Sequence, residues 1–119
     1  MTKFTVRTDT RCEMIDITDK VATFVRESGL RDGICHVFVP HTTAALTINE
    51  NADPDVPRDI LDSLDRVVPL SNRYRHAEGN AAAHVKASLL GASQTVFVEN
   101  GRLVLGTWQS LFFCEFDGP

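Results

Sequence analysis

Histidine, carboxylate and amide side chains gather in four short segments of this 119-residue chain. The segments are residues 40–43, 49–55, 76–84 and 106–109, and one glutamate, Glu115, follows the last of them. Imidazoles and carboxylates together bind divalent metal ions or transfer protons. A P-loop, a G-x-S-x-G elbow and an H-E-x-x-H helix are all missing, so no standard motif fixes the chemistry. The residue types indicate a polar site whose reaction stays open.

His84 illustrates the two interpretations that such residues allow. If Asn80 caps a helix, His84 lies in its first turn, where the positive end of the helix dipole disfavours the imidazolium form. A neutral imidazole is what a metal ligand needs, and the free N–H groups there also suit a phosphate. The residues 81–83 are alanines, which let a ligand or another subunit approach closely. The alternative is a histidine that caps the helix and bonds only to its neighbours.

The other candidates have structural alternatives too. Residues 41–43 follow a strand end and Pro40, so they suit either a loop held by carbonyls or contacts to phosphate. Glu50 follows an apolar strand and has no capping role that explains it. Gln109 and Glu115 share a strand face with apolar neighbours, and a buried polar group needs a partner. They are therefore either satisfied within the fold or directed at a site.

Hydrophobic periodicity predicts the elements that position these segments. Two helices are expected to begin with caps at Thr18 and Asn80 and to end at Gly29 and Gly91, and a third stops before Pro69. Asn100-Gly101 between apolar runs is a hairpin signal. The expected strands are 3–8 with a hairpin partner at 11–16, then 33–39, 43–49, 94–99, 102–105 and 106–116. The pattern predicts a single α+β domain over residues 1–119, with about three helices and a largely antiparallel, sandwich- or barrel-like sheet.

Composition excludes several classes of protein. The formal net charge is −4 and the arginines are spread among acidic residues, which argues against a nucleic-acid partner. No apolar run is long enough to cross a membrane, and the N-terminus has no signal-peptide pattern. Three cysteines without C-x-x-C spacing fit neither a disulfide framework nor a thiolate zinc site. We therefore expect a cytoplasmic protein with reduced thiols.

Three motifs, in order, resemble the YjbQ-like (UPF0047) family. Pro40-His41-Thr42-Thr43 with Asn49-Glu50-Asn51-Ala52-Asp53-Pro54 resembles its first motif. His76-x-x-x-Asn80-x-x-x-His84 with Leu90-Gly91 resembles the middle motif. Gly106-Thr107-Trp108-Gln109, followed by a strand into Glu115-Phe116-Asp117-Gly118-Pro119, resembles the last. The likeness covers most of the chain from Gly33 onward.

The resemblance implies a homotrimer with a polar, metal-associated pocket near the subunit interface. It also implies a secondary thiamine-phosphate synthase activity, which joins hydroxymethylpyrimidine diphosphate to thiazole phosphate and releases pyrophosphate. The divalent ion would be zinc or magnesium, and the partner a small phosphorylated metabolite. Catalytic roles then fall to His41, Glu50, His76, Asn80 and His84, metal ligation to His41, His76 and His84, and substrate binding to Thr42, Thr43, Asn49, Gln109 and Glu115. Another metal-dependent enzyme, such as a phosphate-ester hydrolase, and a non-catalytic binding trimer are the alternatives.

Overall fold

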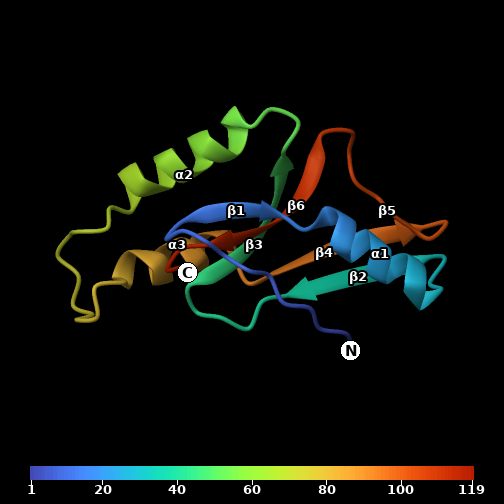
Figure 1. The fold of residues 1–119 in the computed structure, drawn as a ribbon, viewed down its shortest axis with the longest axis horizontal. Coiled ribbons are helices and arrows are strands. Elements are labelled where there is room, and N and C mark those ends of the chain that lie inside the picture. The colour runs from blue at the N-terminus through green and yellow to red at the C-terminus, as the bar shows by residue number, and fades with distance from the viewer.

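The computed structural model describes residues 1–119 and contains three helices and six strands (Figure 1). In chain order they are β1 (Glu13–Asp16), α1 (Thr18–Ser28), β2 (Gly33–Phe38), β3 (Ala44–Glu50), α2 (Asp55–Val67), α3 (Ala81–Leu90), β4 (Ser93–Glu99), β5 (Arg102–Leu103) and β6 (Gln109–Glu115). Every strand pair is antiparallel. The expected α+β class, with three helices and an antiparallel sheet, is confirmed.

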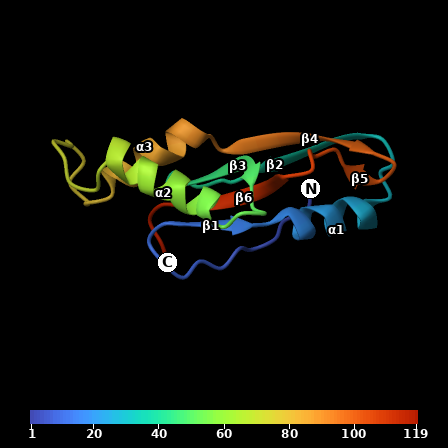
Figure 2. The same ribbon diagram turned by 90° about the horizontal axis from the view of Figure 1, so that it is seen from above.

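The strands form two three-stranded sheets, in the orders β1-β6-β3 and β2-β4-β5. Their longest ladder pairs β3 with β6 over seven residues, from Ala44 opposite Glu115 to Glu50 opposite Gln109. The sheets meet at Leu46 of β3, whose carbonyl accepts a hydrogen bond from Gln94 Nε2 of β4 at 3.1 Å. Figure 2 shows α1 on one side of the β2-β4-β5 sheet and no helix over its other side.

Buried side chains lie on both faces of the β3–β6 pair. Side chains alternate along a strand, so Leu46 and Leu111 enter one core cluster and Ala45 and Phe112 enter another. The first cluster is completed by α1, through Val21 and Val25, and the second by α3, through Ala83 and Ala87. The β3–β6 pair is therefore the central layer, with a helix packed on each side.

The helix and turn signals of the sequence are largely confirmed. Gly29 ends α1 with a φ of 76°, the left-handed conformation that glycine adopts without strain. Asn100 and Gly101 both have positive φ, as a tight hairpin turn requires. The expected cap of α1 by Thr18 is wrong. Asp16 accepts the Thr18 N–H at 2.9 Å, while the Thr18 hydroxyl accepts the Leu111 N–H.

The expected strand at residues 3–8 is wrong. No backbone–backbone hydrogen bond involves residues 1–9, and β1 pairs with β6 instead of forming a hairpin with them. Val6 still packs against the first core cluster. An alternating pattern buries one side of a segment, but a strand also needs a neighbouring backbone to accept its hydrogen bonds.

In a strand that ran from residue 106, Trp108 would share a face with Phe112 and Phe116 and lie in the core, but it is 64% exposed. β6 begins only at Gln109. Residues 106–109 form a turn, in which the Gly106 N–H donates to Gln109 Oε1 and the Gln109 N–H donates to the Gly106 carbonyl. Because Trp108 lies inside this turn, the strand alternation does not apply to it.

We predict that Leu46→Ala lowers the free energy of unfolding by about 2–5 kcal/mol, because it leaves a cavity in the central layer. Leu46 is 1% exposed, whereas Leu89 on α3 is 60% exposed. Leu89→Ala is the matched control and should change stability by less than about 0.5 kcal/mol. Urea unfolding followed by circular dichroism measures both, and equal losses would contradict the assigned core.

Candidate functional site

The structure divides the candidate residues between the two ends of the β3–β6 ladder. At one end Glu50 lies opposite Gln109, and at the other Glu115 lies opposite Ala44. A strand rises about 3.3 Å per residue, so these ends are about 20 Å apart. We call them the Glu50 end and the α3 end, because α3 begins beside the latter. One chain does not gather all the candidates into one site.

Two of the three candidate metal-ligating histidines lie together at the α3 end. The ring centroids of His76 and His84 are 5.2 Å apart, with one ring edge-on to the other. His76 belongs to the irregular segment before α3, and its Nε2 is 3.6 Å from Glu78 Oε2. His84 lies in the first turn of α3 and is half-buried. The middle motif thus becomes a pair of imidazoles at a helix N-terminus.

Asn80 joins this helix start to the chain that follows β6. Its Nδ2 donates to Asp117 Oδ2 at 2.9 Å, and Asp117 Oδ1 lies 3.5 Å from Arg11 Nη1. The expected side-chain cap is therefore wrong: Asn80 stands at the cap position, but its Oδ1, the atom that would accept a helix N–H, makes no hydrogen bond, and only its Nδ2 is engaged. This bond fixes where α3 begins relative to the sheet.

The start of α3 carries polar groups that have no partner in the chain. Asn80 Oδ1 is buried without a hydrogen bond. The N–H groups of Ala81 and Ala82 have no acceptor either, and no acidic residue lies in the first turn. Buried backbone N–H groups almost always find a partner. Several donors and one acceptor are therefore left for a ligand or solvent.

The remaining candidates at the α3 end are held differently. Glu115 accepts hydrogen bonds from the Thr8 hydroxyl at 3.1 Å and from the Asp117 N–H at 3.2 Å. Its carboxylate is thus satisfied within the fold. The carbonyl of Thr43 accepts the Phe116 N–H, which brings the first motif to this end. His41 and Thr42 precede β3 and are exposed.

A three-histidine metal centre requires His41 beside the His76–His84 pair. No group of three or more His, Cys, Asp or Glu side chains in the chain could hold a metal ion. Zinc sites use about four ligands, and the two imidazoles supply half of them. Glu50, whose carboxylate would offer magnesium an oxygen ligand, lies at the opposite end of the ladder. The residues of one chain do not fit a complete metal centre.

Most polar side chains at the Glu50 end form hydrogen bonds to nearby backbone or side-chain groups of the fold. Asn49 Oδ1 accepts the Glu50 N–H at 2.8 Å, and Gln109 Oε1 accepts the Gly106 N–H at 2.8 Å. Asn51 Nδ2 donates to Asp16 Oδ2 at 2.9 Å. These bonds favour the structural interpretation of Asn49 and Gln109, whereas the half-buried Glu50 has no such explanation.

The Asp16 carboxylate accepts several hydrogen bonds near the Glu50 end. Burial alone would raise the pKa of its carboxyl group, but hydrogen bonds from Thr18, Asn51 and Ser110 together hold that pKa below its ordinary value. Asp16 is not among the residues that the sequence singled out, although an aspartate just before a helix is a common start signal. Arg11 and Asp117 are not among them either, since a pairing between distant segments leaves no local signal.

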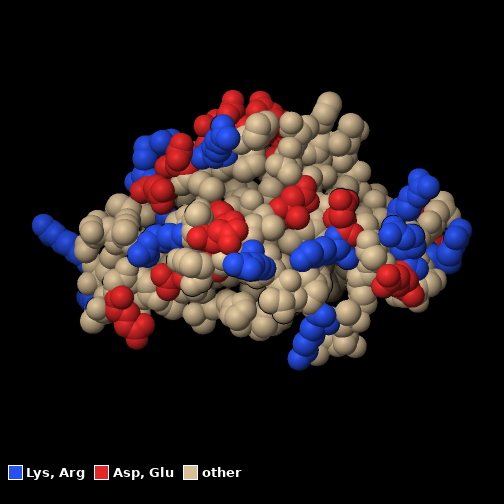
Figure 3. Space-filling model, viewed as in Figure 1, with Lys and Arg blue, Asp and Glu red and all other residues tan.

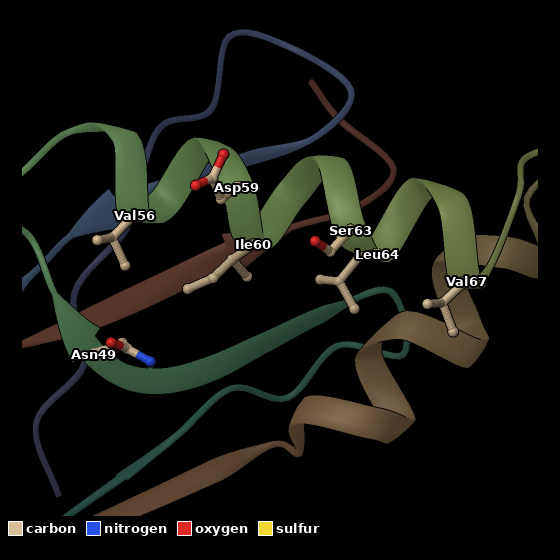
Figure 4. Close-up of a pocket in the computed structure, with 7 residues that line it drawn as sticks. All are labelled: Asn49, Val56, Asp59, Ile60, Ser63, Leu64 and Val67. Atoms are coloured by element: carbon tan, nitrogen blue, oxygen red, sulfur yellow. The ribbon is translucent and has the colours of Figure 1, made fainter.

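An apolar groove of about 420 Å³ runs between α2 and β3, and no histidine lines it (Figure 4). The apolar face of α2 points into it, above Asn49 on β3. No residue of α2 is fully buried. The residues that line the groove are Asn49, Val56, Asp59, Ile60, Ser63, Leu64 and Val67. The groove is thus an open face of α2, separate from the imidazole pair.

Residues 2–119 match the family model described as UPF0047 protein YjbQ-like. The chain belongs to the YjbQ-like (UPF0047) family. UPF0047 protein YugU of Bacillus subtilis is 57% identical over 115 residues, covering 96% of this chain and 87% of YugU. A UPF0047 protein of Archaeoglobus fulgidus is 48% identical over 119 residues, covering 98% and 91% of the two chains.

Solved structures show the same YjbQ-like fold. A YjbQ/UPF0047-family protein of Clostridium acetobutylicum superposes with a TM-score of 0.94 at 58% identity, over 96% of this chain and 88% of that chain. A protein of Aeropyrum pernix gives 0.93 at 39% identity, over 98% and 87%. The family resemblance read from the three motifs is thereby confirmed.

The surface of this YjbQ-like domain mixes charges of both signs. On the face in Figure 3, Lys and Arg side chains are interspersed with Asp and Glu. That distribution agrees with the net charge of −4 and shows no basic stripe on this face. None of the three helices is long and apolar enough to span a bilayer.

The hydrogen bonds to Asp16 predict an acid-dependent loss of stability. Its pKa is lower in the folded chain than its ordinary value of 3.8, so the stabilisation is fully present above about pH 3.8 and is lost as the pH falls through the folded pKa. In Asp16→Asn this part of the pH dependence should vanish. Urea unfolding from pH 6 down to about pH 2.5 measures it. If the free energy of unfolding falls equally with pH in the wild type and in Asp16→Asn, the stabilising role of the Asp16 carboxylate is contradicted.

Proposed function

We propose that the α3 end binds the phosphate group of a small phosphorylated metabolite. The observation that carries this proposal is the pair of N–H groups, of Ala81 and Ala82, that have no acceptor in the chain. Helix N-termini bind phosphate through such groups and through the helix dipole. His76 and His84 add two imidazoles at the same place. Their N–H groups can donate to phosphate oxygens.

The reaction that these donors suit best is the displacement of a diphosphate, as in thiamine-phosphate synthesis. There the thiazole nitrogen bonds to the methylene carbon of the pyrimidine while the bond from that carbon to the diphosphate oxygen breaks. Pyrophosphate leaves with the electron pair, so negative charge grows on its oxygens. Donors already fixed around those oxygens stabilise the transition state more than the ground state. The identity of the two substrates rests on the family resemblance. The donors at the α3 end support the binding of the departing diphosphate.

We also propose that copies of the chain associate, as the resemblance implies for a trimer. The uncovered face of the β2-β4-β5 sheet is apolar: Ile34, Phe38 and Phe97 are each more than half exposed, and Val104 lies beside Phe97. Such a patch on a small protein marks an interaction surface. Association could also bring the Glu50 end of one copy to the α3 end of another, and a divalent ion would draw its missing ligands from there.

Replacing the imidazoles should weaken phosphate binding. We expect His84→Ala and His76→Ala to lower the affinity for pyrophosphate by about tenfold each, because each removes a hydrogen-bond donor to an anion. Thr23→Ala is the control, since Thr23 on α1 bonds to Arg26 and lies outside both the α3 end and the proposed interface. Isothermal titration calorimetry measures all three. Unchanged affinity in both α3-end variants would overturn the binding site.

Activity is tested separately from binding. Purified protein with hydroxymethylpyrimidine diphosphate, thiazole phosphate and a divalent cation should form thiamine phosphate, and His84→Ala should lose most of that rate. Binding of pyrophosphate without any product would overturn the synthase proposal and leave a binding module. Product formation that survives in His84→Ala would place the chemistry elsewhere.

Self-association is tested by light scattering after gel filtration. The wild-type chain has a mass of 13.2 kDa, and a particle of three times that mass is expected. Phe97→Asp should shift it to the monomer, because a charge on the sheet face opposes burial. Phe4→Asp changes a phenylalanine outside this sheet and should leave the assembly intact. A monomeric wild-type protein, or identical behaviour of the two variants, would contradict the proposed interface.

A further inference from the structure

A buried lysine faces a cysteine where α3 meets the start of β1. Lys86 on α3 is only 4% exposed. Its Nζ lies 4.0 Å from the Sγ of Cys12, which directly precedes β1, and it donates to Asp65 Oδ1 on α2. The same Nζ lies 5.9 Å from the centre of the Phe116 ring. Three segments that are distant in the chain thus surround one ammonium group.

This ammonium group has incomplete partners for its degree of burial. An ammonium carries three N–H donors, and Asp65 is the one carboxylate that it reaches. The next nearest polar atom is a thiol sulfur, which is a weak acceptor. Buried lysines are rare unless they are fully paired. Neither the fold nor the proposed phosphate site requires Lys86 to point at a cysteine.

We infer that Lys86 and Cys12 form a reversible oxidative cross-link, a sulfenamide, when the protein meets a peroxide. In the first step hydrogen peroxide oxidises the Cys12 thiol to a sulfenic acid and one water is released. In the second step the Lys86 amine attacks that sulfur, an N–S bond forms, the S–O bond breaks and a second water leaves. The sum is thiol plus amine plus peroxide to sulfenamide plus two waters. The peroxide is reduced and the sulfur is oxidised.

The surroundings set the conditions under which the reaction runs. Burial raises the pKa of the Cys12 thiol, and the charge of Lys86 partly opposes this. Asp65 and Glu115 raise that pKa further, and Arg11 lowers it. Because the thiolate is the form that peroxide attacks, oxidation should accelerate as the pH rises above neutrality. The Lys86 ammonium passes one proton to solvent before its amine attacks the sulfur.

The cross-link would fix α3 against the edge of the β1-β6-β3 sheet. Lys86 lies two residues after His84, so the link would hold in place the helix that carries the imidazole. Release of Asp65 from Lys86 would at the same time remove the ion pair between α3 and α2. The cross-link does not rest on the proposed phosphate site, and its detection requires no ligand.

The experiment exposes the full chain to hydrogen peroxide at neutral and at alkaline pH and measures its intact mass. A sulfenamide lowers the mass by about 2 Da, and a thiol reductant restores it. Peptide mapping should join the peptide of Cys12 to that of Lys86. A disulfide loses the same mass, so Cys114→Ala serves as the control: it leaves the link to Lys86 intact and excludes a bond between Cys12 and Cys114.

Three outcomes decide the inference. A reversible loss of about 2 Da, mapped to the two residues and absent from Cys12→Ser, establishes the link. A gain of about 16 Da or more at Cys12 with no joined peptide overturns it, because the sulfenic acid then persists or oxidises further. A joined peptide between two cysteines overturns it as well. Mapping of the wild-type chain decides the question even if a variant fails to fold.

Discussion

The pairing of β3 with β6 is the constraint on which the rest of the structure depends. Their seven-residue ladder has core clusters on both faces, so a shift of one residue in register would exchange those clusters. α1 packs on one face and α3 on the other, and each is aligned by this ladder. The two ends of the same ladder carry the polar residues. Register therefore fixes both the core and the separation of the candidate groups.

Two of the family motifs are each divided between the two ends of the ladder. The first motif is interrupted by β3 itself, so its histidine lies at one end of the strand and Glu50 at the other. The last motif is divided in the same way by β6, between Gln109 and Glu115. Residues of one motif thus lie at opposite ends of the ladder, about 20 Å apart within the chain. In the assembly that we propose, the two halves of each motif would come from different copies and serve one site.

The elements that the sequence predicted well are those whose signals are local. Gly29, Pro69 and Asn100-Gly101 marked ends and turns that the structure contains, because a backbone conformation or a missing N–H depends on few neighbours. The predictions of a buried Trp108 and of a strand at 3–8 were wrong, because burial and strand pairing depend on distant segments. The grouping of His76 with His84 was expected from the resemblance to the family's middle motif, whereas the part played by Asp117 was not expected.

Two contacts hold the start of α3 in place, and they differ in kind. Asn80 anchors the first turn to Asp117 through a hydrogen bond between side chains, while Lys86 anchors the second turn through a buried charge. A buried charge is costly unless it is paired. The ion pair between Lys86 and Asp65 therefore holds α2 next to α3. α2 has no fully buried residue of its own. The helix that carries His84 is thus held on the side of the sheet, and α2 is joined to it by this ion pair and by the packing of Leu61 and Leu64 against the second core cluster.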